Sequence, residues 1–263
     1  MKYLVTGATG HLGGLVVKHL LNRVPATDVI VSVRDPQRAQ NLAAQGIEVR
    51  QGDFDTGVDF SGANALLLIS ADSGDRVTAH RKAIEAARTA GVSRIAYTSV
   101  TDADTSPVGL AADHKATEEA IRATGIPFTF LRNGMYHENY LPISPTTATG
   151  EGRIATASRD DLAEAAAIAL TGEGHENKTY ELTGPTAWSF AELNTLVGQT
   201  HHPIPADERK AALEGFGLPP EVAALLVDIE VNIAAGTFNK VHPDLETLLG
   251  RTPKTIEEAV KEL

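Results

Sequence analysis

The chain begins with MKYLVTGATGHLGGLVVKHLL (residues 1–21), in which a short apolar run leads into three regularly spaced glycines. The apolar run predicts a short strand over residues 3–5, and the apolar residues after the glycines recur at helical spacing. A strand that turns directly into a helix leaves backbone N–H groups unpaired at the helix start, where the helix dipole favours an anion. The stretch therefore predicts a phosphate-binding turn, with a purely structural tight turn as the alternative.

Each glycine has its own expected task in such a turn. Gly7 permits the tight turn, Gly10 lets a phosphate approach the backbone, and Gly13 lets the helix pack close to the strand. The spacing is G-x-x-G-x-x-G, whereas many dehydrogenases carry G-x-G-x-x-G. Because three glycines alone are weak evidence, the prediction of a dinucleotide site depends on the strand before them and the helix after them.

Strand-like and helix-like segments alternate along the first 135 residues. Short β-branched or apolar runs such as DVIVSV (28–33) and VSRIAYTSV (92–100) are separated by helical segments that end at a glycine, such as RVTAHRKAIEAARTAG (76–91). The alternation predicts an α/β fold, a Rossmann-like doubly wound parallel sheet with strand order 3-2-1-4-5-6 and a seventh strand. We expect residues 1–135 to form the nucleotide-binding core.

The second half of the chain is less regular, and residues 136–263 are predicted to be mainly a small α/β substrate-binding lobe with elements that return to the core sheet. A helix is expected to begin near Ser158, and KTYELTG (178–184) is typical of a strand. Ser189 and Glu192 have the spacing of a capping box. The closing segment PKTIEEAVKEL (253–263) is expected to be a helix with proline in its first turn.

Composition excludes several classes of protein. The 263 residues carry a net charge of -11 and no cysteine, so we expect no nucleic-acid partner, disulfide or zinc–thiolate site. No apolar stretch approaches the roughly twenty residues that a membrane-spanning helix needs. The N-terminal apolar run is interrupted at Gly7 and does not have the form of a signal peptide. A cytoplasmic protein that does not bind membranes is therefore expected.

The end of the second predicted strand indicates which dinucleotide binds. NAD enzymes usually place a carboxylate there, whereas an arginine suits the 2′-phosphate of NADP. This chain has Arg34, with Arg38 one helical turn later, although Asp35 lies beside Arg34. We therefore predict NADPH rather than NADH. Asp53, at the end of the third strand, either accepts a hydrogen bond from the adenine amino group or stabilises a turn.

Six stretches together resemble one known family. They resemble the NAD(P)H:quinone oxidoreductase type 2 group of atypical short-chain dehydrogenase/reductases, which is related to triphenylmethane reductases and NmrA-like proteins, over nearly the whole chain. The stretches are TGATGHLGG (6–14), VRDPQRAQNLAAQGIEVRQGD (33–53), LLLIS (66–70), AYTSVTDADTSPVGLAADH (96–114), LRNGMYHENYL (131–141) and ATASRDDLAEAAA (155–167).

This resemblance implies an NADPH-binding Rossmann domain with a small C-terminal lobe that closes over a quinone-like or extended aromatic substrate. It also implies that the glycine loop, the end of the fourth strand and the loop after the sixth strand contact the cofactor. The implied residues are Gly7, Thr9, Gly10, His11, Leu12, Gly13, Arg34, Ile69, Ser70, Asn133 and Tyr136. The segment after Leu141 is shorter than in the group, so we expect a pocket of different width or gating.

The chain lacks the tyrosine that ordinary short-chain dehydrogenases use as an acid. Aligning LAADHKATEEA (110–120) with their Y-x-x-x-K pattern places Leu110 at the tyrosine and His114 at the lysine. Leucine cannot donate a proton, which disfavours alcohol oxidation and simple ketone reduction. Reduction of a quinone is less demanding, because water can protonate the phenolate that forms, and the protein then supplies positioning.

Three residues are candidates for a direct part in the reaction. Ser99 ends the fifth strand, where it either binds substrate or caps a turn. His114 holds the nicotinamide ribose, relays a proton, or is a hydrogen-bonded histidine without function. Tyr136 stacks on the nicotinamide, bonds a quinone oxygen, or fills an apolar gap. Asn133 is expected to be a cofactor or substrate contact on the same loop.

These residues predict an NADPH-dependent reductase of a small-molecule quinone or related conjugated aromatic substrate. Two alternatives stay open. One is a ketoreductase or tailoring enzyme of aromatic polyketide biosynthesis, with His114 or water as the acid. The other is a non-catalytic NmrA-like NADP(H) sensor. His201 and His202 have no third ligand at a suitable spacing, so no metal site is predicted. A homodimer is left open.

Overall fold

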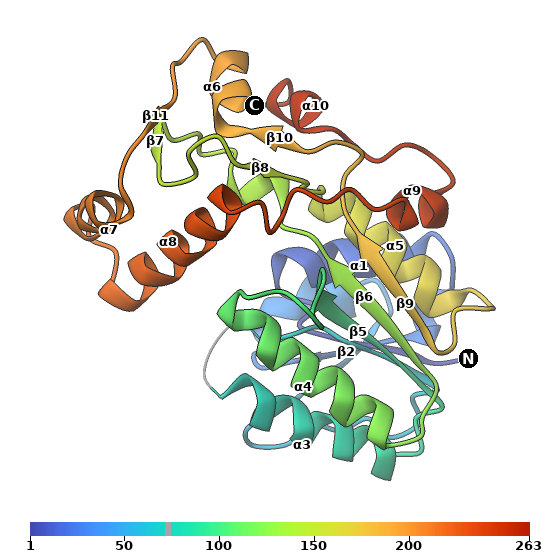
Figure 1. Cartoon of the computed structure of the whole chain (residues 1–263). Coiled ribbons are helices and arrows are strands. Elements are labelled where there is room, and N and C mark those ends of the chain that lie inside the picture. The colour runs from blue at the N-terminus through green and yellow to red at the C-terminus, as the bar shows by residue number, and fades with distance from the viewer. Residues whose placement is uncertain (72–74) are drawn as a thin grey trace.

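A seven-stranded parallel sheet forms the centre of the protein in the computed structural model, which describes residues 1–71 and 75–263 (Figure 1). The strands lie in the order β3-β2-β1-β4-β5-β6-β9, which confirms the predicted strand order and the seventh strand. Every pairing within this sheet is parallel. The strands are β1 (Tyr3–Thr6), β2 (Val29–Val33), β3 (Glu48–Gln51), β4 (Ala65–Leu68), β5 (Arg94–Val100), β6 (Phe128–Asn133) and β9 (Lys178–Leu182).

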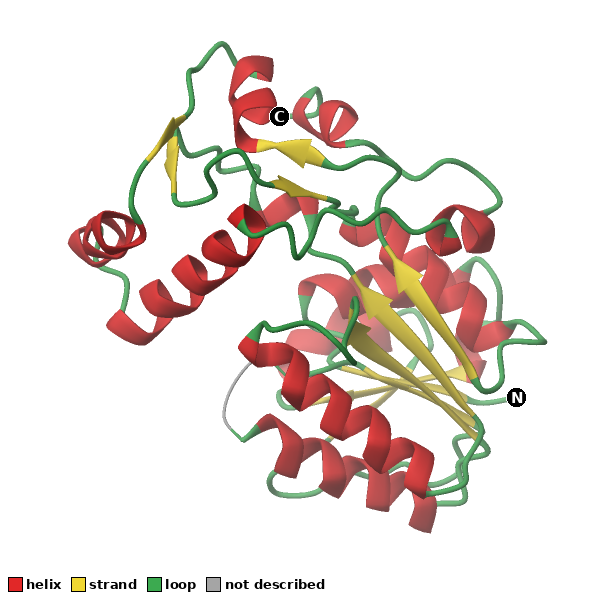
Figure 2. Cartoon of the chain, in the orientation of Figure 1, coloured by secondary structure: helices red, strands yellow, loops and turns green. Residues whose placement is uncertain are grey.

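Helices cover both faces of the sheet (Figure 2). Successive strand residues alternate between the two faces, so Val5 and Leu67 join one apolar core while Leu4 and Leu66 join the other. Helices α1 (His11–Leu21) and α5 (Arg159–Thr171) pack on the first face, and α3 (Arg76–Thr89) and α4 (Gly109–Ala123) pack on the second. The doubly wound α/β fold is therefore confirmed.

The N-terminal half also contains three short elements that connect the strands. They are η1 (Ala26–Asp28), η2 (Pro36–Ala39) and α2 (Gln40–Ala43). The segment between β2 and β3 is thus a 3₁₀ turn followed by one short α-helix. Asp35 caps the 3₁₀ turn, since its side chain accepts a hydrogen bond from the Gln37 amide at 3.0 Å.

Most of the second half forms a lobe over the carboxyl ends of the sheet strands (Figure 1). Parts of this half return to the core: β9 pairs with β6, α5 packs beside α1, and Leu245 joins the same apolar core as Val5. The lobe contains a β10–β8 sheet and a β11–β7 sheet, each of two strands. Its elements are η3 (His137–Asn139), β7 (Thr146–Thr147), β8 (Arg153–Ile154), β10 (Trp188–Ser189), α6 (Phe190–Leu196), β11 (His202–Pro203), α7 (Ala206–Gly215), α8 (Pro220–Ala234), α9 (Asp244–Leu249) and α10 (Ile256–Val260).

Local capping signals in this half agree with the sequence in all but one case. The Ser158 side chain caps α5, and Ser189 and Glu192 form the capping box of α6. The expectation that proline lies in the first turn of the closing helix is wrong. Thr255 and Glu258 form a capping box there, so α10 starts at Ile256 and Pro253 precedes the cap. Within the described ranges, no helix combines the length and apolar character that crossing a membrane requires.

Candidate functional site

The glycine turn between β1 and α1 has the geometry that the sequence predicts. Gly7 has a φ of 65°, in the left-handed region that favours glycine, and its carbonyl accepts a hydrogen bond from the Gly10 amide at 2.9 Å. In the described part of the chain, no side chain caps the N-terminus of α1. The amides of its first turn are therefore available to an anion, which the helix dipole also attracts.

A cavity of about 420 Å³ opens over this turn at the carboxyl edge of the sheet. Its walls come from the ends of β1 and β2, from the segments that follow β1, β2, β3, β4 and β6, and from α1, α3 and α5. The lining residues are Thr6, Gly7, Thr9, Gly10, His11, Leu12, Gly13, Ser32, Val33, Arg34, Arg38, Gly52, Asp53, Phe54, Asp55, Ile69, Ser70, Ala71, Ala79, Tyr136 and Arg159. A ligand-binding crevice is expected at this edge of an open α/β sheet.

Twelve of the residues that the sequence predicts as cofactor contacts lie together in this cavity. They are Gly7, Thr9, Gly10, His11, Leu12, Gly13, Arg34, Arg38, Asp53, Ile69, Ser70 and Tyr136. Asn133 is the predicted cofactor contact that is not among the lining residues in the described chain. It ends β6 with 6 % of its surface exposed, and its carbonyl accepts a hydrogen bond from the Thr101 amide at 3.2 Å. The role of each residue toward a ligand stays a prediction.

Two arginines make one end of the cavity positive. Arg34 and Arg38 are exposed and line it, and within residues 1–71 and 75–263 neither guanidinium forms an ion pair. The carboxylate of Asp35 is engaged in capping the 3₁₀ turn and is not among the lining groups of the described chain. This end of the cavity therefore presents uncompensated positive charge that suits a phosphate.

Asp53 stabilises a turn, which is one of the two roles that the sequence predicts for it. Its carboxylate accepts a hydrogen bond from the Asp55 amide at 2.8 Å, and its backbone forms an isolated bridge with Gly57. The residue also lines the cavity. A carboxylate has two oxygens, so the turn leaves acceptor capacity for a ligand amino group.

The opposite end of the cavity carries a stacked pair of side chains. The guanidinium carbon of Arg159 lies 4.9 Å from the centre of the Tyr136 ring, within the range of a cation–π contact. The same guanidinium donates a hydrogen bond to the Asn139 side chain at 2.6 Å. Both Tyr136 and Arg159 line the cavity, so an aromatic face and a positive charge are held side by side there.

Two of the candidate reacting residues lie on the other face of the sheet. The His114 ring is 6 % exposed and its Nδ1 lies 2.8 Å from the Tyr97 hydroxyl. Ser99 is 5 % exposed and donates a hydrogen bond to Glu118 at 2.7 Å. Within the described chain, neither residue is among those lining the cavity. Their geometry favours packing and hydrogen bonding within the core over contact with a substrate.

Burial also fixes the charge state of His114. Loss of solvent around the ring lowers the pKa of His114 to about 3, and the nearby Arg76 and His80 lower it further in the same direction. The imidazole is therefore neutral at pH 7. A neutral, buried ring is poorly suited to relay protons to a substrate at this pH.

We expect His114 to make the protein less stable in acid. Its pKa is lower in the folded chain than in the unfolded chain, where the ordinary value is 6.5, so the unfolded state binds more protons between pH 6.5 and about 3. The free energy of unfolding should fall as the pH falls through this window, by up to about 1.4 kcal/mol per pH unit for one histidine. Denaturant unfolding of wild type and His114→Gln from pH 7 to pH 4 measures the difference. Equal slopes for the two proteins would contradict a buried neutral His114.

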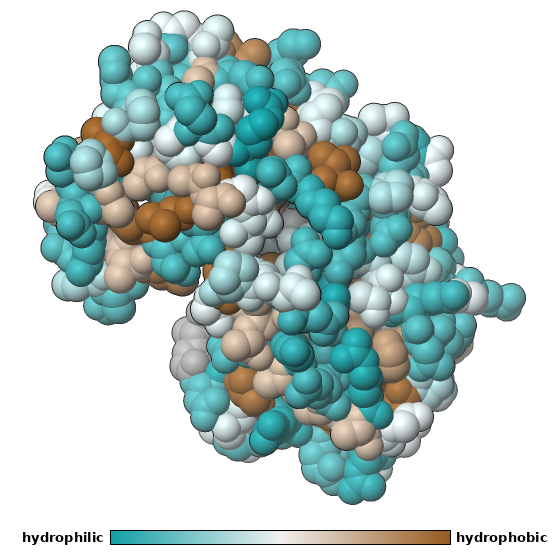
Figure 3. Space-filling model, viewed as in Figure 1, coloured by the Kyte–Doolittle hydropathy of each residue, from teal (hydrophilic) through white to brown (hydrophobic). Residues whose placement is uncertain are grey.

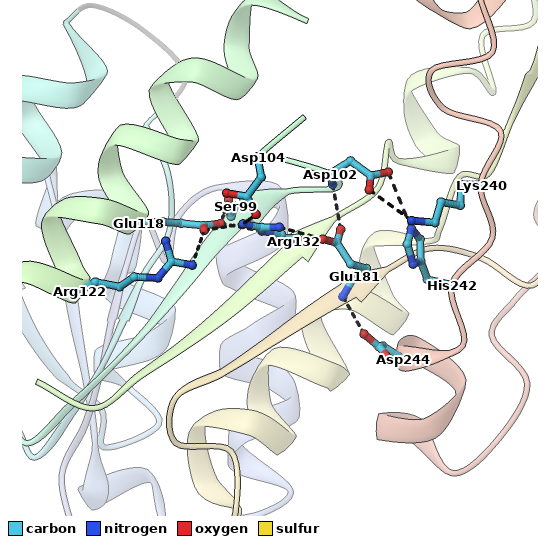
Figure 4. A network of polar contacts seen from close by, with 10 residues as sticks. All are labelled: Ser99, Asp102, Asp104, Glu118, Arg122, Arg132, Glu181, Lys240, His242 and Asp244. Atoms are coloured by element: carbon cyan, nitrogen blue, oxygen red, sulfur yellow. Dashed lines mark hydrogen bonds and ion pairs between the residues drawn. The ribbon is translucent and has the colours of Figure 1, made fainter. Parts of the chain in front are cut away.

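An ion-pair network joins the carboxyl ends of β5, β6 and β9 to neighbouring segments (Figure 4). Arg132 on β6 contacts the buried Glu118 through both Nε and Nη2, at 2.9 and 2.7 Å. It also bonds Asp104 at 2.7 Å and Glu181 at 3.0 Å. Ser99 belongs to this network through Glu118. The network ties β5, β6, α4 and β9 together where they approach the lobe.

Asp102, Glu181 and His242 bring three groups that could hold a metal ion within 4.8 Å of one another. Two cations already contact the carboxylates, since Lys240 lies 3.5 Å from Asp102 and Arg132 lies 3.0 Å from Glu181. A metal ion would have to displace both of these positive charges. We therefore propose no metal site here.

Sequence reasoning missed several residues that line the cavity. They are Thr6, Ser32, Val33, Gly52, Phe54, Asp55, Ala71, Ala79 and Arg159. Arg159 carried a recognisable signal, because it is the first residue of α5 and a positive charge is unfavourable beside the positive end of a helix dipole. An arginine at such a position therefore indicates a stabilising contact elsewhere, which here is the cation–π contact with the Tyr136 ring.

Comparison with known proteins agrees with this geometry. Residues 7–173 match the model of a family described as NAD(P)H-binding. Quinone oxidoreductase 2 of Escherichia coli K12 is 41 % identical over an alignment of 278 positions that covers 98 % of this chain and 97 % of that protein.

Two solved structures are also similar. The structure of the NADPH-dependent quinone oxidoreductase QOR2 of Escherichia coli with NADPH superposes with a TM-score of 0.94 at 41 % identity over 99 % of both chains. The triphenylmethane reductase of Citrobacter sp. with NADP(H) also has a TM-score of 0.94, at 39 % identity over 100 % of this chain and 99 % of its own. The chain therefore belongs to the NAD(P)H-binding family, alongside quinone oxidoreductase 2 of Escherichia coli.

Proposed function

We propose that this protein is an NADPH-dependent reductase that acts on quinones or related conjugated and polycyclic aromatic compounds. The observation that carries the proposal is a cavity that joins the start of α1 to Arg34 and Arg38. Among the described residues, no side chain caps that helix start and neither guanidinium forms an ion pair. The first feature suits a diphosphate and the second suits a 2′-phosphate. The similarity to quinone oxidoreductase 2 and to triphenylmethane reductase supports the class of substrate.

The residues present fit the dinucleotide from end to end. The first-turn amides of α1 would hold the diphosphate, and Gly13 allows the helix to lie against the turn. Arg34 and Arg38 would hold the 2′-phosphate, and the pair of Tyr136 and Arg159 would lie toward the nicotinamide. When bound, NADPH supplies a hydride, and with one proton from water this reduces a quinone to a hydroquinone.

The protein positions the cofactor and the substrate and does not supply an acid. Leu110, at the place of the usual tyrosine, is partly buried against Val108 and Val100 and has no proton to give. His114 is buried and neutral, which does not favour the ketoreductase alternative with His114 as its acid. The hydroquinone anion is a weak base that water protonates, so the reaction needs no protein acid. Holding the two reactants in contact then supplies most of the rate increase.

An apolar surface on the lobe supports an aromatic substrate. Ile229 on α8 packs into a cluster with Leu110 and Met135, next to the loop that carries Tyr136. Leu225 and Leu226 extend the same face of α8 outward and are 49 % and 38 % exposed. Apolar side chains gather over this helix in Figure 3. A flat aromatic molecule would cover part of this surface on binding.

Replacing Arg34 by alanine should weaken NADPH binding and leave NADH binding nearly unchanged. A charge-assisted hydrogen bond contributes about 1.5–3 kcal/mol, so we expect the Kd for NADPH to rise about tenfold to 100-fold. NADH has no 2′-phosphate and should lose less than about threefold. Titration calorimetry with both cofactors measures the two effects. Equal losses would mean that Arg34 does not recognise the phosphate.

Turnover is the direct test of the proposed activity. Purified protein should oxidise NADPH in the presence of simple and polycyclic quinones, followed as the loss of NADPH absorbance. An NADP(H) sensor would instead bind both oxidised and reduced cofactor without turnover. Absence of NADPH oxidation with every quinone tested would contradict the proposed activity.

Two finer parts of the proposal concern location and assembly, and both stay predictions. A chain without cysteine forms no disulfide and needs no oxidising compartment, which is compatible with the proposed cytoplasmic location. A homodimer is supported by apolar side chains on the surface of the lobe, with Phe216 81 % exposed. Light scattering on the purified protein measures the assembly.

A further inference from the structure

The segment that follows β4 is held in place by side chains instead of by a neighbouring strand. The amides of Ile69, Ser70 and Ala71 lie just beyond the last paired residue, Leu68. Each donates a hydrogen bond of 2.9 Å to a different side chain: Ile69 to Thr6, Ser70 to Thr98 and Ala71 to His80. All three residues of the segment line the cavity over the glycine turn.

These three hydrogen bonds take the place of backbone hydrogen bonds between strands, which stop at the end of β4. Thr6 and Thr98 stand on β1 and β5, the two strands that flank β4, so their hydroxyls continue the sheet by one residue each. His80 comes from α3, on one face of the sheet, and reaches the residue farthest from the ladder. With its amide hydrogens engaged, the segment can present only carbonyl oxygens and side chains to a ligand.

The hydrogen bonds around His80 determine which nitrogen of its ring carries a hydrogen. Its Nε2 accepts from the Ala71 amide and therefore carries no hydrogen. Its Nδ1 lies 3.0 Å from the Thr117 hydroxyl, which in turn donates to the Asp113 carbonyl at 2.9 Å. Nδ1 therefore holds the ring's one hydrogen and donates it to Thr117. The side chain is 0 % exposed, and burial lowers the pKa of His80 to about 4, with Arg76 acting in the same direction.

We propose that His80 is a positioning residue for the cofactor, because its Nε2 holds the Ala71 amide and thereby the edge of the cavity after β4. This inference rests on the proposed function, since it assigns the cavity to NADPH. His80 does not itself touch the ligand, because within the described chain it is not among the lining residues. It acts through the backbone that it holds in place, because side chains that do not touch a ligand commonly fix the residues that do.

Substitution of His80 by asparagine or by glutamine removes one of its two hydrogen bonds at a time. The amide of asparagine reaches the place of Nδ1, so His80→Asn keeps a partner for Thr117 and leaves the Ala71 amide without an acceptor. The longer glutamine reaches the place of Nε2, so His80→Gln keeps an acceptor for Ala71 and releases Thr117. Both variants place one buried amide group at the same site, so each serves as the control for the other.

We expect His80→Asn to raise the Kd for NADPH about tenfold and His80→Gln to stay within about threefold of wild type, as measured by titration calorimetry. Hydrogen exchange of the Ala71 amide should accelerate in His80→Asn and stay slow in His80→Gln, without any cofactor present. Wild-type affinity in His80→Asn, or an equal loss in both variants, would overturn the positioning role. Wild-type protein that binds no NADPH would instead contradict the proposed function.

Discussion

Replacing Gly13 by alanine is expected to abolish measurable NADPH binding at ordinary concentrations and to destabilise the fold. A Cβ at this position would lie 2.2 Å from the Gly7 carbonyl oxygen and 2.9 Å from the Ala8 Cα, which are backbone atoms that cannot rotate away. Helix α1 would have to move off the turn, and its first-turn amides would move with it. We expect a loss of about 3 kcal/mol or more in stability and at least about 100-fold in affinity, measured by denaturant unfolding and calorimetry.

Gly14 provides the matched control for this prediction. A Cβ there would lie 3.6 Å from the Ala8 carbonyl oxygen, an ordinary contact, although the residue is the next one along the same helix. Gly14→Ala should bind NADPH as wild type does and gain about 0.5–1 kcal/mol in stability, because alanine favours the helix. Similar affinities for Gly13→Ala and Gly14→Ala would contradict the close packing of α1 against the turn.

Replacing Arg132 by leucine should cost about 3–5 kcal/mol in the free energy of unfolding. Arg132 is 5 % exposed and Glu118 is 0 % exposed, and the two form a pair with two hydrogen bonds. Among the described residues, the buried Glu118 carboxylate would then keep Ser99 and a 3.2 Å ion pair with the partly exposed Arg122. A buried charge with so little compensation is strongly destabilising, and denaturant unfolding at pH 7 measures the loss.

Removal of both charges tests whether the cost comes from the poorly compensated Glu118 carboxylate. The double variant Arg132→Leu/Glu118→Leu should recover most of the stability, because two apolar side chains need no partner. Arg153→Leu is a surface control, since Arg153 pairs with the exposed Glu192 and should cost less than about 1 kcal/mol. A double variant no more stable than Arg132→Leu would contradict this explanation.

The glycine turn and the order of the strands could be predicted from the sequence because their signals are local. A glycine at Gly7 is needed for a positive φ, and at Gly13 for a close backbone approach, so residue type alone reports the geometry. Strand order follows from the alternation of strands and helices and from the handedness of the crossovers. Arg34 and Arg38 were found in the same way, since the end of a strand fixes where they lie.

The positions of Ser99 and His114 could not be obtained by that reasoning, because the end of a strand does not reveal which face a side chain occupies. Tyr97 lies in the core beneath α3 and α4, and Ser99 is two residues farther along β5, so both side chains point to that face. Thr98 points to the opposite side and holds the Ser70 amide. Counting residues from the apolar Tyr97 would have placed Ser99 next to α4.

The most direct test of the central claim is a calorimetric titration of wild-type protein with NADPH and, separately, with NADH. We claim that bare amides at the start of α1 hold the diphosphate while Arg34 selects the phosphorylated cofactor. One NADPH should bind per chain, with NADH at least about tenfold weaker. No heat of binding with either nucleotide would contradict the claim for the amides, and equal affinities would contradict the claim for Arg34.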